Sequence, residues 1–265
     1  MDDQNAGDDW DSFWGNVESA QKEEPEHKPY VSKDGFDQVN IYRGLFEVEY
    51  LLDVIGSQGL ICGGYARWAC SPTQTPIPAS DVDVYGYNDA SIDNLKHTFK
   101  EMGLSIVHEN NISISYKRPE EPEHPFFACP TIQLIKPVVE GKVVSVGTVE
   151  DVLGNFDFTI VRVALMQNGD KHTAIADADY IHDETKRILR IKNIHCPVSS
   201  TLRCMKYSRK GYFLPPTQVL NILYDWDNRS DTYKTRLIEF LFMANDGEGL
   251  TKKQVEELES MMRID

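Results

Sequence analysis

Two aspartates stand two positions apart in a run that alternates between apolar and polar residues. In DVDVYGY, Asp81 and Asp83 alternate with Val82 and Val84, which is the period-two pattern of a β-strand. Successive strand side chains point to opposite faces, so both carboxylates face one side and both valines face the core. Two like charges this close repel unless a cation lies between them. Because Mg²⁺ is held by one or two carboxylates together with substrate phosphates, the pair predicts a site for Mg²⁺ or Mn²⁺.

A glycine pair upstream bears on whether these aspartates are a metal site or only a charged strand edge. Gly63 and Gly64 end the apolar run LICGG and precede YARWAC, which is helix-like. Glycines between a strand and a helix leave backbone N–H groups open to a phosphate. Arg67 follows one helical turn later, where a guanidinium can meet a triphosphate. The alternative is an ordinary strand-to-helix turn.

The order of these motifs resembles the DNA-polymerase-beta-like nucleotidyltransferase superfamily, in particular the head domain of poly(A) polymerases and CCA-adding enzymes. LICGGYAR, SPTQTPIPAS and DVDVYG follow one another as that family's strand, Gly-Gly, arginine, loop and Asp-x-Asp do. The resemblance implies that Gly63 and Gly64 bind nucleotide phosphates, that Arg67 is the family's arginine by position, and that Asp81 and Asp83 bind catalytic metal ions. It implies an NTP substrate and transfer of a nucleoside monophosphate to a hydroxyl. An RNA 3′ end is the favoured acceptor, and a protein hydroxyl is the alternative.

A second match lies near residue 200. SSTLRCMKYSRKGY resembles the neck helix that follows the head in those enzymes, which implies that Arg203, Lys206, Tyr207 and Lys210 face the nucleotide and the RNA end. Independently of the resemblance, residues 186–210 carry eight bases and no acid. On an acidic protein such a segment is where a polyanion binds, so we expect the RNA acceptor there. A solvated charged face is the alternative.

A third carboxylate is what the resemblance leaves open. Active members of the superfamily usually bring one on a neighbouring strand, and here the strand-like TIQLI offers Gln133 instead. An amide is a poor metal ligand beside a carboxylate and cannot act as a base. Asp157 in NFDFTI is the other candidate, either as a catalytic residue or as a cap or turn residue. If Asp157 reaches the pair, the site has its third carboxylate; if it does not, the alternative to an enzyme is a catalytically inactive binding protein on the same fold.

The first thirty residues differ in composition from the rest. Residues 1–30 hold nine acids against two lysines, and such a segment buries too little apolar surface to offset its ordering entropy. Within residues 8–17, Trp10, Phe13 and Trp14 share one helical face. They belong either to a solvated tail or to a short helix that binds a protein partner. The alternative function is therefore an inactive accessory protein, of a viral or phage kind, that binds its partner through this tail.

The pattern of elements predicts an α+β fold: a nucleotidyltransferase-like mixed sheet with flanking helices, then a smaller helical region. We expect an acidic, disordered tail over 1–30, an α/β domain over 31–185 and a helical neck and C-terminal region over 186–265. Strands are expected at 59–64, 81–87, 104–116, 131–139 and 156–165, although a buried helix also fits the last. Helices are expected at 37–56, 91–103 and 148–154 and through the C-terminal region, where Thr251 and Gln254 are placed as a capping box.

The composition excludes several classes of protein. The 265 residues carry 42 acids and 27 bases, a formal charge of −15, which argues against a protein that coats DNA through many phosphate contacts. No apolar run approaches the ~20 residues of a membrane helix, so we expect no membrane partner. The acidic N-terminus is unlike a signal peptide, and five scattered cysteines form no disulfide pattern. We therefore expect a cytoplasmic, reducing environment.

Overall fold

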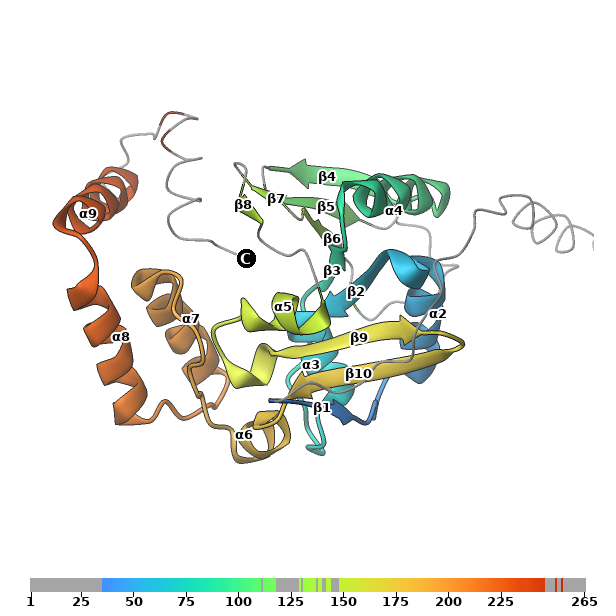
Figure 1. Cartoon of the computed structure of the whole chain (residues 1–265), viewed down its shortest axis with the longest axis horizontal. Helices are drawn as coiled ribbons and strands as arrows, with labels where there is room; N and C mark the ends of the chain where they lie inside the picture. Colours follow the sequence, from blue (N-terminus) through green and yellow to red (C-terminus); the bar gives the residue numbers. More distant parts are fainter. Residues whose placement is uncertain are drawn as a thin grey trace, which may run out of the picture.

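The computed structural model describes residues 35–110, 112–117, 129, 131–136, 138–139, 142–143, 148–245, 251 and 254. An eight-stranded sheet forms the middle of the molecule, with helices on both faces and further helices beyond one end (Figure 1). The segment proposed to bind a protein partner, residues 8–17, lies outside the described residues. Within the described part, no helix has both the length and the apolar character needed to cross a membrane.

The sheet is mixed. Its strands, in spatial order, are β1 (Phe36–Val39), β10 (Lys171–Asp177), β9 (Val163–Asn168), β2 (Gly59–Cys62), β3 (Val82–Gly86), β6 (Thr131–Ile135), β5 (Ser113–Lys117) and β4 (Ser105–Glu109). Neighbours pair antiparallel except β3 and β6, which run parallel. A separate two-stranded sheet is formed by β7 (Val138–Val139) and β8 (Lys142–Val143). The predicted α+β class is confirmed.

Each face of the sheet carries its own hydrophobic cluster. The first packs under α2 (Leu45–Ile55), α3 (Gly63–Cys70) and α4 (Asp89–Glu101). The second packs under α5 (Val149–Gly154) and α7 (Pro197–Arg209). Strand alternation sends Val82 and Val84 to the first cluster and Tyr85 to the second, as the period of two requires. The side chain of Asp83, which alternates with those of Val82 and Val84, therefore faces α5 and α7.

The N-terminal part of the predicted helix over 37–56 is wrong. Residues 36–39 instead form β1, which pairs with β10 at the edge of the sheet. The helix begins only at Leu45, after a left-handed Gly44, and its apolar stripe of Val48, Leu51, Leu52 and Ile55 is buried as predicted. FDQV has too few apolar residues to distinguish a strand from a helix by periodicity, and an available sheet edge decided between them.

The segment 156–165 is only partly a strand. Residues Thr159–Val161 form a 3₁₀ turn, η2, and the strand β9 starts at Val163. A second 3₁₀ turn, η1 (Gly56–Gln58), joins α2 to β2. Every residue from 156 to 165 is buried, and only the end of β9 beyond this range, residues 166–168, is half-buried. A continuous apolar run of this kind does not specify its secondary structure, because both faces of the backbone are buried.

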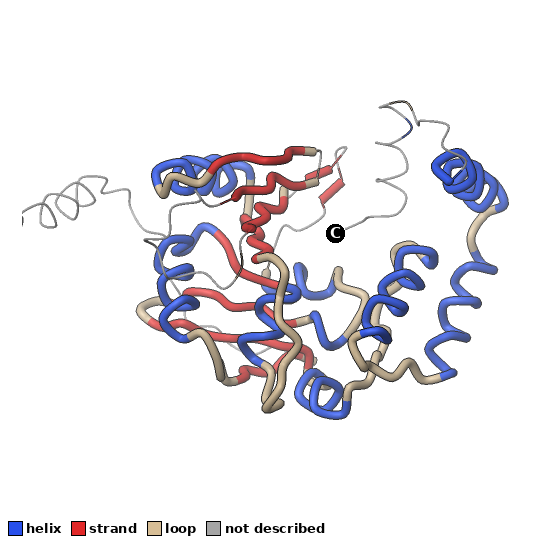
Figure 2. Tube along the Cα trace, turned by 180° about the vertical axis from the view of Figure 1, so that it is seen from behind, coloured by secondary structure: helices blue, strands red, loops and turns tan. Residues whose placement is uncertain are grey.

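Beyond β10 the chain is helical. It forms α6 (Tyr180–Lys186), α7, α8 (Pro216–Asn228) and α9 (Asp231–Asn245). Seen from the front and from behind, α8 and α9 lie at the end of the molecule opposite α2 and α4 (Figures 1 and 2). Cys204 and Tyr207 of α7 share a cluster with Leu60 and Ile175 of the sheet. Thr251 and Gln254 form the predicted capping box, with the Thr251 amide 3.0 Å from Gln254 Oε1 and the Gln254 amide 3.4 Å from Thr251 Oγ1. The domain boundaries at 30/31 and 185/186 stay predictions.

Candidate functional site

The two aspartates lie at the start of β3, on the face toward α5 and α7. Val82 and Val84 are fully buried on the opposite face, which confirms the predicted alternation. The side chains of Asp81 and Asp83 are half-buried. Ser80 Oγ donates a hydrogen bond to Asp81 Oδ1 at 2.8 Å, which restrains the carboxylate of Asp81.

Gly63 brings the start of α3 against one of these carboxylates. Its φ is +69°, and a Cβ at this position would lie 2.8 Å from Asp83 Oδ2, so both backbone conformation and space require glycine. Gly64 faces open space. The N-cap residue Cys62 makes no side-chain capping bond, and the first N–H groups of a helix lack intrahelical partners. The end of α3 can therefore offer amide donors beside Asp83.

Gln133 occupies the place where a third carboxylate was sought. The strands β3 and β6 run parallel with Asp83 opposite Gln133. The amide Nε2 of Gln133 donates to Asp81 Oδ2 at 3.1 Å. Gln133 thus donates a hydrogen bond to one oxygen of the aspartate pair. As a neutral amide it supplies neither a negative charge nor a base.

Asp157 does not complete the pair. Its side chain is 3% exposed and accepts hydrogen bonds from Arg203 Nη1 at 2.8 Å and from Ser200 Oγ at 3.3 Å. Across the described residues, no three His, Cys, Asp or Glu side chains are grouped so as to hold a metal ion. The structure thus joins Asp157 to α7, and Asp81 and Asp83 remain a two-carboxylate site. Arg203, predicted to face the nucleotide, is half-buried and is the ion-pair partner of Asp157.

Arg67 points into the protein instead of toward solvent. It is 1% exposed; its Nη1 donates to the hydroxyl of Tyr212 at 3.0 Å and its Nη2 to the carbonyl of Ile77 at 3.1 Å. The carboxylate of Glu184 lies 4.0 Å away. The triphosphate contact predicted for Arg67 is therefore not available to it in this structure, because the side chain is enclosed by the loop before β3.

Four of the eight basic residues in segment 186–210 form ion pairs within the protein. The pairs are Arg187–Glu184 at 3.8 Å, Arg190–Asp183 at 3.0 Å, Lys192–Asp179 at 2.9 Å and Arg203–Asp157 at 2.8 Å. Lys206, Arg209 and Lys210 are exposed at the end of α7, and they form no ion pair with any other described residue. The surface expected to bind an RNA acceptor is therefore much smaller than the sequence indicated.

Lys210 is the base most closely linked to the aspartates. Burial of its ammonium group lowers its pKa, and the positive charges of Lys206 and Arg67 lower it further, while Asp81 acts in the opposite direction. Its Nζ lies 5.8 Å from the centre of the Tyr207 ring. Lys210 is thus a cation within electrostatic reach of the carboxylate pair, as a phosphate-binding residue has to be.

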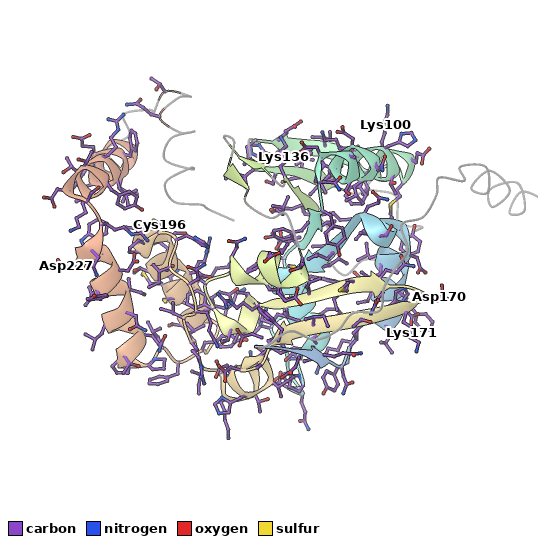
Figure 3. The ribbon with its side chains drawn as sticks, in the orientation of Figure 1. Lys100, Lys136, Asp170, Lys171, Cys196 and Asp227 are labelled. Carbon is purple, nitrogen blue, oxygen red and sulfur yellow. The ribbon has the colours of Figure 1, made fainter. Side chains whose placement is uncertain are left out.

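Tyr207 is a core residue. Its ring packs edge-on against Phe158 and Tyr212, with centroids 5.8 Å and 5.7 Å apart, and burial raises its pKa. The nucleotide contact predicted for Tyr207 is replaced by packing between α7 and η2. Cys196, labelled in Figure 3 at the start of α7, is likewise buried and packs with Leu237 of α9.

Three residues near the site were not found from the sequence. Ser80 bonds Asp81, and its position next to the motif was an available signal. Tyr212 and Glu184 meet Arg67 in the interior, and no local pattern marks them because they lie more than one hundred positions away in the chain.

The donor set fits a divalent cation shared with a phosphate. Two carboxylates on one side of a strand end are enough protein ligands for Mg²⁺ when phosphates complete its shell. The space that a Cβ at Gly63 would fill lies against one of those carboxylates. Cys62, opposite Asp83 across the β2–β3 pair, is held as a neutral thiol, because burial and the charge of Asp83 raise its pKa.

Comparison with solved structures identifies the fold. A CCA-adding enzyme in complex with ATP is 14% identical with a TM-score of 0.52, and the match covers 86% of this chain and 54% of that chain. A tRNA nucleotidyltransferase with a primer tRNA and an incoming ATP analogue is 18% identical (TM-score 0.49; 82% and 60%). A Thermotoga maritima CCA-adding enzyme with tRNA is 11% identical (TM-score 0.48; 88% and 71%). The chain has a nucleotidyltransferase-like fold.

This likeness covers only part of the solved structures. The chain spans only 55–60% of the length of the first three solved structures that it resembles. No protein-family model and no curated protein matches the sequence.

Proposed function

We propose that this protein is a metal-dependent nucleotidyltransferase that moves a nucleoside monophosphate from an NTP to a hydroxyl acceptor. The observation that carries the proposal is the close approach of Gly63 to Asp83, where a Cβ on the glycine would lie 2.8 Å from Asp83 Oδ2. It joins an uncapped helix N-terminus, which attracts phosphate, to a carboxylate pair, which attracts a cation. A fold shared with a CCA-adding enzyme that binds ATP supports the same substrate class.

Asp81 and Asp83 would hold Mg²⁺ or Mn²⁺. When bound, such an ion neutralises charge on the transferring phosphoryl group and orients the attacking and leaving oxygens. The amides at the start of α3 position the phosphates beside Asp83. Lys210 adds a positive charge on the side of Asp81. This chemistry is mainly positioning and electrostatic stabilisation, so it needs few reactive side chains.

An RNA 3′ end is the acceptor that we propose. The exposed Lys206, Arg209 and Lys210 form a basic end of α7 on a protein whose formal charge is −15. A polyanion is attracted to such a local patch and repelled by most of the remaining surface. A protein hydroxyl as acceptor is an outcome that the experiment below distinguishes.

Gln133 supports a second candidate function. With an amide bonded to Asp81 and Asp157 paired with Arg203, the chain offers two carboxylates where the resemblance predicts three. On this alternative the protein binds nucleotide or a protein partner and transfers nothing, and residues 8–17 form the partner-binding segment.

Label transfer tests the proposal. The full chain is incubated with each α-labelled NTP, Mg²⁺ or Mn²⁺ and total RNA, and the products are separated on a gel that resolves protein from RNA. The double variant Asp81→Asn/Asp83→Asn runs beside the wild type. Asp225→Asn/Asp227→Asn is the matched control, because it removes two carboxylates with the same spacing from α8, remote from β3 (Figures 1 and 3).

Label in RNA that the first variant abolishes and the control retains is the expected result. Label in the protein band, with the same dependence, would change the acceptor and keep the activity. A folded wild-type chain that transfers no label from any NTP contradicts the proposal. It would leave the inactive binding protein as the function.

A further inference from the structure

The loop that leads from α3 to the first aspartate pairs with none of the described strands. Residues 71–81, SPTQTPIPASD, include Pro72, Pro76 and Pro78, which have no backbone N–H and cannot join a sheet ladder as donors. The loop nevertheless has to place Asp81 next to Asp83 with the accuracy that a shared cation requires. Its carbonyl groups also need donors, since several lie below the surface.

Side chains supply those donors at every second residue of the loop. Arg43 donates to the carbonyls of Ser71 and Thr73, Arg187 to Thr75 at 2.9 Å, Arg67 to Ile77 at 3.1 Å, and the Cys129 thiol to Ala79 at 3.6 Å. Three arginines from three separate segments thus replace the neighbouring strand. The last of these contacts lies two residues before Asp81.

Two of the arginines are themselves fixed by one buried tyrosine and one buried glutamate. The hydroxyl of Tyr212 accepts hydrogen bonds from Arg67 at 3.0 Å and from Arg187 at 3.2 Å, and it donates to Glu184. Glu184 is fully buried and accepts a second bond from Ser71 Oγ at 2.8 Å. Within this network Arg67 Nη1 and Nη2, the Tyr212 hydroxyl and the Glu184 carboxylate are hydrogen-bonded, while the buried Arg67 Nε has no partner among the described residues. Buried groups bonded in this way are held in place, because breaking one of these bonds leaves a polar group unpaired at a high cost.

We propose that Arg67 and Tyr212 are positioning residues that hold the loop 71–81, and with it Asp81, in the geometry needed for cation binding. Tyr212 lies two residues after Lys210, so the same network links the basic end of α7 to the carboxylate pair. The assignment of Asp81 as a metal ligand rests on the proposed function. The holding of the loop rests on the hydrogen bonds alone.

A direct contact between Arg67 and the triphosphate is the competing role. Both terminal nitrogens of the guanidinium already donate within the protein, and 1% of the residue is exposed. A phosphate would have to displace the Ile77 carbonyl or the Tyr212 hydroxyl to reach them. The two roles predict different effects of removing the tyrosine hydroxyl. If Arg67 holds the loop, the loop should loosen; if Arg67 contacts phosphate, the hydroxyl is not needed and the loop should not change.

Tyr212→Phe is the decisive variant, because it removes one oxygen and keeps the packed ring. Tyr233→Phe is the matched control: its hydroxyl is half-buried on α9 and bonds Cys196. In the chain without ligand, hydrogen–deuterium exchange is followed in peptides covering residues 71–86. We expect Tyr212→Phe to speed exchange there about tenfold or more, because the hydroxyl makes three hydrogen bonds and each is worth about two- to tenfold, and Tyr233→Phe to leave it unchanged. Equal exchange in both variants overturns the positioning role.

Catalytic constants then separate positioning from mere stability. At matched fractions of folded protein, Tyr212→Phe and Arg67→Lys should lower kcat with little change in KM for the NTP. Both variants should also bind Mn²⁺ more weakly, as measured by electron paramagnetic resonance titration. A raised KM with unchanged Mn²⁺ binding would assign Arg67 to the triphosphate instead. A wild type that binds neither Mn²⁺ nor NTP contradicts the proposed function, while the exchange experiment still decides whether the network holds the loop.

Discussion

At Gly63, one added methyl group would clash with a carboxylate of the proposed nucleotide site. A Cβ there would lie 2.8 Å from Asp83 Oδ2, in a backbone with φ of +69°. Gly63→Ala should therefore abolish ATP binding and cost about 1–2 kcal/mol of unfolding free energy, because of the clash and the left-handed conformation. Calorimetric titration with ATP and urea unfolding measure the two effects.

Gly103→Ala is the control for that experiment. Gly103 has nearly the same φ, +73°, but a Cβ there meets nothing within 4 Å. It should lose stability through the backbone conformation and keep its affinity for ATP. Retained ATP binding by Gly63→Ala would contradict the placement of phosphate at the start of α3.

If Lys210 contacts the phosphates as proposed, nucleotide binding should depend on pH in a specific way. Burial of its ammonium group, aided by Lys206 and Arg67, lowers its pKa, so it loses its charge at a lower pH than an ordinary lysine, whose pKa is about 10.4. Only the charged form attracts phosphate. ATP affinity should therefore begin to fall as the pH rises toward 10, and Lys210→Arg should keep its affinity because arginine stays charged.

Titrations with ATP between pH 7 and pH 10 check this dependence. Lys171→Arg, at an exposed residue of the β9–β10 hairpin (Figure 3), should follow the wild type. Parallel curves for wild type and Lys210→Arg would show that Lys210 does not contact the phosphates.

At the scale of elements, a cluster of ion pairs fastens α6 to the segment before α7. Lys192 donates to Asp179 at 2.9 Å, and Arg190 contacts Asp179 and Asp183. The pKa of Asp179 is lowered by its hydrogen bond from Lys192 and by the nearby charges of Lys192 and Arg190. Arg190 and Lys192, which the sequence suggested for RNA binding, are therefore paired within the protein. The same bonds hold the segment that leads from α6 to α7.

Asp179→Asn tests this fastening through the pH dependence of stability. A carboxylate whose pKa is lowered by folding stabilises the protein above its unfolded pKa of about 3.9, and the contribution disappears as the pH falls through the folded value. The variant should be less stable at pH 7 by about 0.5–1 kcal/mol, since the pair is partly exposed. Urea unfolding at pH 7, 5, 4 and 3 should show the difference from wild type shrinking below about pH 4. Asp170→Asn, in the turn between β9 and β10 (Figure 3), is the control and should show no such difference.

At the scale of the whole molecule, the candidate site is assembled between the sheet and the helical region. Asp81 immediately precedes β3, Gly63 begins α3 and Gln133 lies in β6, while Lys210 lies at the end of α7. The helices beyond leave apolar side chains exposed: Leu220, Leu223 and Tyr224 of α8 are 63%, 57% and 73% exposed. Substrate binding is therefore expected to depend on the attachment of α7 to the sheet, and hardly on α8.

Deletion of residues 1–30 distinguishes the two functions at this scale. A nucleotidyltransferase whose site lies between β3 and α7 should keep its rate of label transfer within about twofold, since distant surface changes rarely alter stability by more than 0.5 kcal/mol. A protein that works through its acidic tail should lose its partner on the same deletion. The label-transfer assay and a pull-down with the full-length and truncated chains measure the two outcomes. A truncated chain that folds but transfers no label would place residues 1–30 in the catalytic unit.

The amino-acid sequence by itself determined the local geometry of the main motif. Alternation buries Val82 and Val84 on one face, glycines start α3, and the capping box at Thr251 forms as its spacing predicts. These features depend on neighbours within a few residues, where steric and hydrogen-bonding preferences of the backbone dominate. The fold class followed from the same patterns, because the order of strands and helices restricts how layers can pack.

Only the tertiary structure decided which charged residues are available. Arg67 and Arg203 look like ligands in the sequence, but Tyr212 holds Arg67 in the interior and Asp157 pairs with the half-buried Arg203. A buried charge is stable only with a partner, and those partners lie 145 and 46 positions away in the chain. No local pattern reveals such pairs, since they depend on which distant elements the hydrophobic core brings together.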